Sequence, residues 1–173
     1  MSVPDKTRNL IYLSLGSNIR PQENLRLAVE LLALQVGVVS LSSAWRTPAV
    51  GSHGPDFLNA AILIKTDLPP DMIKSIILQP IEAKLGRVRT TDKNSPRTID
   101  IDILVVNRIV YDKELWRRAH LAVPLSEINN ELAHPESGAS IAEVARQLSK
   151  VNPIHAEPHV LKKIINPNPD HSY

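Results

Sequence analysis

Apolar residues and carboxylates alternate over the segment Ile99-Asp100-Ile101-Asp102-Ile103. A period of two is the repeat of a β-strand, because successive side chains point to opposite faces of a sheet. The segment therefore predicts a strand in which Asp100 and Asp102 project together from one face while the isoleucines face the other side. Ordinary amphipathic patterning gives the same alternation, so a solvated polar face is the alternative interpretation of these two carboxylates.

Other elements follow from periodicity and from turn residues. Alternation over residues 11–15, before Gly16-Ser17-Asn18, predicts a first strand that ends in a turn. Apolar spacings of three and four predict a helix that follows Pro21 and stops at Gly37. Residues 38–45 and 57–65 predict two strands, and the loop between them is longer than a simple hairpin needs. Loops of that length more often carry function than merely connect elements.

The second half of the chain is predicted to add a helix and further strands. Residues 67–85 predict a helix that Pro80 should kink or divide, and residues 99–106 with 109–111 predict a strand and a short hairpin. The order β-α-β-β-α-β predicts an α+β fold, the ferredoxin-like sandwich, with an antiparallel sheet and its helices on one face. We expect one domain over residues 1–150, with a last helix at 141–148. Residues 151–173 are expected to form a tail that packs on the surface or is partly disordered.

Composition restricts the class of function. A chain of 173 residues with 43% hydrophobic content fits one globular domain. Lys and Arg total 20 against 18 for Asp and Glu, so a net charge of +2 predicts neither nucleic-acid nor membrane binding. The absence of cysteine excludes disulfides and thiolate metal sites. No apolar run has membrane-spanning or secretory length, so we expect a cytoplasmic protein.

A basic loop precedes the strand that carries the two carboxylates. Arg87, Arg89 and Arg97 bracket this loop, which also holds Lys93. Guanidinium groups bind phosphate oxygens bidentately, and paired carboxylates near phosphate favour magnesium. Phosphoryl-type transfer needs this combination of metal ligands and cations. A surface ion-pair cluster is the competing interpretation, although a glycine and a Ser-Pro pair favour a loop that could cover a ligand.

The run Ser95-Pro96-Arg97-Thr98-Ile99-Asp100-Ile101-Asp102-Ile103-Leu104 resembles the signature of the 6-hydroxymethyl-7,8-dihydropterin pyrophosphokinases. Supporting matches at residues 15–18, 46–48, 57–61 and 86–89 extend the resemblance over residues 12–135. It implies a ferredoxin-like fold, ATP as co-substrate and two Mg²⁺ ions. The implied reaction transfers pyrophosphate from ATP to the hydroxymethyl group of the dihydropterin, giving AMP and the pterin diphosphate, in folate biosynthesis. The expected partners are these small molecules alone, bound by a monomer.

The resemblance also implies a role for individual residues. Asp100 and Asp102 would hold the metal ions, and Arg87 and Arg97 would complete the catalytic set. The residues implied around ATP are Gln79, Glu82, Arg87, Arg89, Arg97, Ile103 and Arg118. The residues implied around the pterin are Thr47, Pro48, Ala49, Val50, Phe57, Asn59 and His120. Phe57 would stack on the pterin, and the amide of Asn59 can read the edge of the ring because it both donates and accepts.

The sequence departs from the family pattern at residues 115–124. A Pro-His pair and several loop residues of the relatives are missing there, so Arg118 and His120 are the nearest matches to an Arg-x-Phe whose Phe stacks on the pterin. Asn94 stands where many relatives have tryptophan. A shorter cover predicts poorer exclusion of water and slower turnover.

Two alternatives to an active enzyme come from other functional classes. The first is a catalytically weakened relative that only binds pterin or nucleotide, against which the retained set of Asp100, Asp102, Arg87 and Arg97 argues. The second is an RNA-binding ferredoxin-like module. Aromatic residues make up 3% of the chain, and aspartates stand on the strand where stacking rings would be expected, so the sequence disfavours this second alternative.

Overall fold

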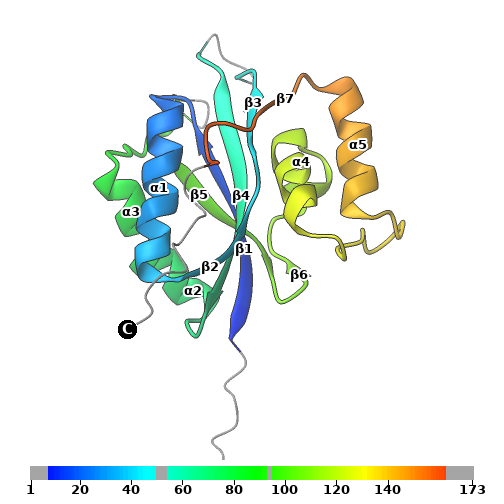
Figure 1. Cartoon of the computed structure of the whole chain (residues 1–173), viewed down its shortest axis with the longest axis horizontal. Coiled ribbons are helices and arrows are strands. Elements are labelled where there is room, and N and C mark those ends of the chain that lie inside the picture. Colours follow the sequence, from blue (N-terminus) through cyan, green and yellow to red (C-terminus); the bar gives the residue numbers. More distant parts are fainter. Residues whose placement is uncertain (1–7, 50–53, 93–94, 163–173) are drawn as a thin grey trace, which may run out of the picture.

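The computed structural model describes residues 8–49, 54–92 and 95–162. Its centre is an antiparallel sheet with the strand order β6-β5-β1-β4-β3-β7, in which β2 also pairs with β4 (Figure 1). The strands are β1 (Asn9–Ser17), β2 (Gly37–Leu41), β3 (Ala44–Thr47), β4 (Phe57–Thr66), β5 (Asp100–Val106), β6 (Ile109–Val110) and β7 (His155–Glu157). The helices are α1 (Pro21–Gln35), α2 (Pro70–Met72), the π-helix η1 (Ile73–Leu78), α3 (Gln79–Lys84), the 3₁₀-helix η2 (Lys113–Trp116), α4 (Ala119–Ile128) and α5 (Ile141–Val151).

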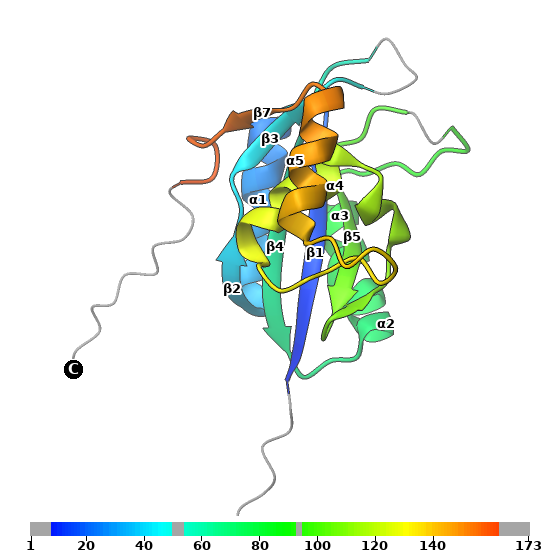
Figure 2. The ribbon, with the colours of Figure 1, turned by 90° about the vertical axis from the view of Figure 1, so that its right-hand side faces the viewer.

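Helices cover both faces of the sheet rather than one, which corrects one part of the predicted architecture (Figures 1 and 2). Helices α1, η1 and α3 pack on the face that carries Leu13, while α4 and α5 pack on the opposite face. The reason lies in β4, where Ile62 and Ala61 point to opposite faces and are both buried. A strand that is apolar on both faces needs cover on both. Helix α4 was not predicted because Pro124 lies inside it.

The predicted strand over residues 38–45 is two strands. At the break between β2 and β3, the backbone N–H of Ser42 donates to the carbonyl of Ala61 at 2.9 Å, and the N–H of Ala61 donates to Ser42 Oγ at 2.8 Å. The serine side chain thus replaces a ladder partner while the chain bends. Both strands still pair with β4, β2 with residues 62–65 and β3 with residues 57–59.

The segment 67–85 is one continuous helical run from Pro70 to Lys84, which Pro80 does not divide but which changes from π-helix to α-helix at Gln79. Pro80 has no N–H to donate, and the π-helical turn of η1 ends just before it, at Leu78. The β5–β6 hairpin is confirmed, with Asn107 and Arg108 at φ of 46° and 74°, the left-handed conformations of a tight two-residue turn. No helix of the described residues has the length and apolar character needed to cross a membrane.

The end of the described chain returns to the sheet. Strand β7 pairs with β3, and Arg46 Nε binds Glu157 Oε1 at 2.8 Å across this pairing. Val160 and Leu161 are then buried against the α1 side of the core, at 7% and 4% exposure. These contacts hold the connection between α5 and β7 beside β3.

Candidate active site

A pocket of about 380 Å³ opens on the α4 side of the sheet. This volume lies within the range of small-molecule sites, roughly 300–1,000 Å³. Its wall combines strands β1, β3, β4 and β5 with the start of α4 and the residues that follow α5. The lining residues are Ser14, Leu15, Gly16, Thr47, Pro48, Phe57, Asn59, Arg97, Asp100, Asp102, Arg117, Arg118, Ala119, His120, Leu121, Asn152 and Pro153.

Strand β5 brings the two carboxylates into this pocket together. Asp100 pairs with Gly16 of β1 and Asp102 pairs with Ser14, so the two side chains lie one above the other on the face toward α4. Ile101, between them, is 2% exposed and packs on the α1 side. The alternation in the sequence therefore gives the orientation that it predicted.

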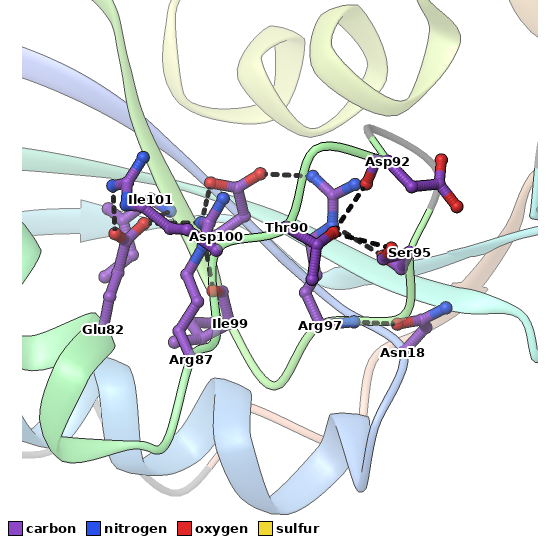
Figure 3. Close-up of polar contacts among 11 residues, drawn as sticks. Asn18, Glu82, Arg87, Thr90, Asp92, Ser95, Arg97, Ile99, Asp100 and Ile101 are labelled. Atoms are coloured by element: carbon purple, nitrogen blue, oxygen red, sulfur yellow. Dashed lines mark hydrogen bonds and ion pairs between the residues drawn. The ribbon is translucent and has the colours of Figure 1, made fainter.

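Asp100 accepts from two arginines (Figure 3). Arg87 binds its Oδ1, and Arg97 Nη1 binds its Oδ2 at 2.6 Å. Burial alone would raise the pKa of Asp100, but the hydrogen bonds and charges of Arg87 and Arg97 outweigh it and hold the pKa below its ordinary value. Asp100 is thus an ionised carboxylate that orients two cations.

Glu82 fixes the other end of this network. Its side chain is 5% exposed, and its carboxylate accepts from Arg87 Nη1 at 2.8 Å, Arg89 Nη2 at 3.0 Å and the backbone N–H of Ile101 at 2.9 Å. Burial raises the pKa of Glu82 even though these donors favour the charged form. Figure 3 shows Glu82 on the far side of Arg87 from Asp100, so Arg87 bridges helix α3 and strand β5.

Asp102 is exposed and makes no hydrogen bond or ion pair with any residue that the structure describes. Desolvation at the pocket floor, followed by repulsion from Asp100, raises its pKa. A divalent cation would relieve that repulsion. Within the described ranges no third acidic or histidine side chain completes a metal cluster, so further ligands would have to be phosphate oxygens or water, the usual situation for magnesium.

The opposite side of the pocket is apolar with one fixed amide. Asn59 is 6% exposed, and its Nδ2 donates to Thr47 Oγ1 at 2.9 Å. A Cβ on Gly16 would stand 3.3 Å from Asn59 Oδ1, so the glycine leaves room for this amide beside the strand. The guanidinium carbon of Arg97 lies 5.8 Å from the ring centre of Phe57, which joins this side to the carboxylates.

The shortened segment supplies the remaining wall. Arg118 and His120 both line the pocket, and Arg118 Nε binds Glu114 at 2.9 Å. Burial, and then the charge of Arg118, lowers the pKa of His120, so this imidazole is neutral at pH 7. The start of α4 thus places a neutral ring and a cation in the same pocket as Phe57.

The structure separates the predicted site residues into two groups. Thr47, Pro48, Phe57, Asn59, Arg97, Asp100, Asp102, Arg118 and His120 line the pocket. The pocket wall does not include Gln79, Glu82, Arg87, Arg89, Ile103 or Ala49. Gln79 is exposed at the start of α3, and Ile103 packs against the α1 side of the core. Val50, Lys93 and Asn94 lie outside the described residues.

Sequence reasoning missed several wall residues, above all Arg117, Asn152 and Pro153. Arg117 adjoins Arg118, so the sequence offers two neighbouring cations in the segment that departs from the family pattern. This pair could have indicated that Arg117 also lines the pocket. Asn152 and Pro153 gave no such signal, because they reach the pocket through the pairing of β7 with β3.

Comparisons with known proteins point to one family. A family model described as 7,8-dihydro-6-hydroxymethylpterin-pyrophosphokinase matches residues 12–130. A 2-amino-4-hydroxy-6-hydroxymethyldihydropteridine pyrophosphokinase from Bacillus subtilis is 37% identical over 166 residues, which cover 86% of this chain and 98% of that protein. The protein of the same name from Methylorubrum extorquens is 40% identical over 154 residues, covering 82% of this chain and 93% of that one.

Solved structures give the same fold. A Plasmodium falciparum HPPK-DHPS triple mutant with pteroate aligns with a TM-score of 0.65 at 12% sequence identity. The alignment covers 83% of this chain and 44% of that one, so this chain spans less than half of the larger protein. At this identity the likeness supports the ferredoxin-like architecture alone.

Proposed function

The chain belongs to the 7,8-dihydro-6-hydroxymethylpterin-pyrophosphokinase family, and we propose that its pocket transfers the terminal pyrophosphate of ATP to the hydroxymethyl oxygen of 6-hydroxymethyl-7,8-dihydropterin. The products are AMP and the pterin diphosphate, and the reaction belongs to folate biosynthesis. The protein is accordingly an ATP-dependent transferase.

One observation carries the assignment of the reaction to this pocket. Asp100, Asp102 and Arg97 line the same cavity as Phe57 and Asn59, and Arg97 contacts both groups. The acidic and cationic side suits a magnesium-bound polyphosphate, and the apolar side with its fixed amide suits a flat heterocycle. A protein that only binds pterin has no need of the carboxylates, so this arrangement favours an active enzyme over a weakened relative.

We assign the metal to the two carboxylates of β5. Asp102, whose pKa is raised by desolvation in the pocket and then by the charge of Asp100, gains from a nearby divalent cation, and Asp100 stands beside it on the same face. Two Mg²⁺ ions are proposed, with phosphate oxygens and water as the other ligands. When bound, magnesium supplies charge that neutralises the phosphates and polarises the phosphorus.

The protein's own residues then orient the reactants. Thr47, Pro48 and Phe57 hold the pterin, and the Asn59 amide reads its edge. The hydroxymethyl oxygen attacks the β-phosphorus of ATP, the bond from that phosphorus to the oxygen bridging the α- and β-phosphates breaks, and AMP leaves with the bridging oxygen. The hydroxyl proton passes to solvent. Arg97 stands where negative charge builds during this transfer, so its stabilisation is greatest in the transition state.

The remaining cations have supporting roles in this proposal. Arg87 is held between Glu82 and Asp100, so it fixes the carboxylate that faces the metal and adds positive charge behind it. The nucleotide would extend beyond the cavity. There it would contact the exposed side chains of Arg89 and Gln79, and also Ile103. His120 would face the pterin opposite Phe57, and Arg118 would meet the phosphates. One copy of the chain suffices for this set, and we propose a cytoplasmic monomer.

Product analysis tests the function. The protein is incubated with Mg²⁺, ATP and 6-hydroxymethyl-7,8-dihydropterin. The nucleotides and pterins are then separated, and mass spectrometry identifies and quantifies them. We expect AMP and a pterin carrying two phosphates in equal amounts. A 6-methyl pterin, which lacks the hydroxyl, should release no AMP. Formation of ADP with a pterin monophosphate, or no AMP at all, would overturn the proposal.

A further inference from the structure

The turn after β1 is tied to the segment that carries Arg97. The backbone N–H groups of Asn18 and Ile19 both donate to the carbonyl of Arg97, at 3.1 and 3.3 Å. In return, the N–H of Arg97 donates to Asn18 Oδ1 at 2.7 Å, as Figure 3 shows. Both backbone polar groups of Arg97 are thus bound by two adjacent residues, which fixes where its side chain leaves the backbone.

The same asparagine reaches the segment that leads into Phe57. Asn18 Nδ2 donates to the carbonyl of Pro55 at 3.3 Å, two residues before β4 begins at Phe57. Asn18 is 3% exposed, so both ends of its amide are used in a nearly dry setting where a lost partner is costly.

The turn itself is held rigidly. The Nδ2 of Asn24, a second buried asparagine, donates to the carbonyl of Ile19 at 2.6 Å, and Ser17 Oγ donates to the same carbonyl at 3.2 Å. Arg20, which follows, adopts the left-handed conformation with φ of 42° just before Pro21. Asn18 therefore projects from a fixed support, and the two segments that it binds are positioned relative to β1.

We propose that Asn18 is a positioning residue that couples the two substrate sites, by fixing Arg97 on the phosphate side and the approach to Phe57 on the pterin side with one amide. The inference rests on the proposed function. Asn18 touches neither substrate in this assignment, since it is absent from the pocket wall. Its effect passes through Arg97 and Phe57, which already lie 5.8 Å apart from guanidinium carbon to ring centre.

Two consequences follow for substitutions at this position. Asn18→Ala leaves the N–H of Arg97 and the carbonyl of Pro55 without their side-chain partner. Since displacements of about 1 Å cost up to roughly 100-fold in rate, kcat should fall about 10- to 100-fold. Asn18→Asp keeps an oxygen for the N–H of Arg97 but loses the donor to Pro55. Asn18→Asp should therefore have a kcat closer to that of the wild type than Asn18→Ala has, but binding of one substrate should no longer affect binding of the other.

The test combines kinetics with paired titrations. Calorimetry measures the dissociation constant of the dihydropterin with and without saturating Mg²⁺ and α,β-methylene ATP, and the ratio of the two constants is the coupling factor. We expect a coupling factor above 1 in the wild type and close to 1 in both variants. Affinity for the ATP analogue alone should change by less than about threefold, because Asn18 does not contribute to binding of the nucleotide in the ground state.

Asn129→Ala is the matched control. Asn129 is 8% exposed, and its Oδ1 accepts from the backbone N–H groups of Glu131 and Leu132 at 3.0 and 2.9 Å, away from the pocket. This variant should lose stability like Asn18→Ala yet keep kcat and the coupling factor. If Asn18→Ala keeps the wild-type kcat and coupling, or if Asn129→Ala loses both equally, the inference is overturned while AMP formation by the wild type still supports the proposed function. A wild type that forms no AMP overturns both.

Discussion

The buried carboxylate of Glu82 offers a quantitative test of how the arginines are held. Glu82→Gln keeps an oxygen that can accept from the N–H of Ile101 but removes the negative charge that faces Arg87 and Arg89. Arg89 is 63% exposed and can turn to water, whereas Arg87 is 14% exposed and cannot. The cost therefore falls mainly on Arg87.

The contacts that remain set the magnitude. Breaking a buried pair typically costs about 3–5 kcal/mol when the remaining charge is left alone. Arg87 is not left alone, because Asp100 and the carbonyl of Ile99, at 3.2 Å, still accept from it. Burial also raises the pKa of Glu82, which means that desolvation already offsets part of the attraction. We expect a loss of about 2–3 kcal/mol in the free energy of unfolding, just below that range.

Urea denaturation and calorimetry measure this loss. For a chain of this size, 1 kcal/mol corresponds to roughly 2–4 °C in Tm, so Glu82→Gln should lower Tm by about 4–12 °C. Glu131→Gln is the control, because Glu131 pairs with Arg108 at the surface and is 72% exposed. An exposed pair is worth roughly 0–1 kcal/mol. If Glu82→Gln is no more destabilising than Glu131→Gln, Glu82 does not anchor Arg87.

Three further outcomes are expected. The pKa of Asp100 lies below its ordinary 3.8, so the stability that it contributes is present above pH 3.8 and is lost as pH falls through the folded-state pKa. In urea titrations, the wild type should therefore lose more unfolding free energy between pH 5 and 3 than Asp100→Asn does. Arg97→Ala should lower kcat more than it weakens binding of α,β-methylene ATP, with partial rescue by Arg97→Lys, and an unchanged kcat with lost affinity would reassign Arg97 to simple binding. His120→Phe should tighten pterin binding by about 0.5–1.5 kcal/mol in calorimetry and leave the ATP analogue unaffected, whereas unchanged or weaker pterin binding would remove His120 from the stacking position.

The sequence was most informative where structure is local. The alternation around Asp100 and Asp102 depends on residues two apart, so it predicts both the strand and the shared face. The Asn107-Arg108 turn and the change of helix type next to Pro80 depend on neighbouring residues in the same way. These features needed no knowledge of the rest of the chain.

Long-range pairing limited the rest of the prediction. The family motif indicates that Glu82 is a nucleotide ligand, and only the packing of α3 on β5 reveals that its side chain is buried, at 5% exposure. Asn152 and Pro153 reach the pocket because β7 pairs with β3 more than 100 residues earlier in the chain, as the bond between Arg46 and Glu157 shows. Helix α4 carries a proline, so its existence follows from the apolar β4 face that it covers rather than from its own sequence.

The rate of AMP formation by Asp102→Asn shows whether pyrophosphate transfer at this pocket depends on a metal held by the carboxylates of β5. This substitution keeps the size of the side chain and disrupts no hydrogen bond of the described residues, so the fold should survive. A bound metal would lose the one carboxylate that has no arginine partner among the described residues of the pocket wall. Asp71→Asn, an exposed carboxylate outside the pocket wall, serves as the control. We predict that at saturating Mg²⁺ Asp102→Asn forms AMP at least about 100-fold more slowly than the wild type, with an unchanged Tm, and that Asp71→Asn matches the wild type. Wild-type rates of AMP formation from Asp102→Asn would contradict a metal-assisted pyrophosphate transfer at this pocket.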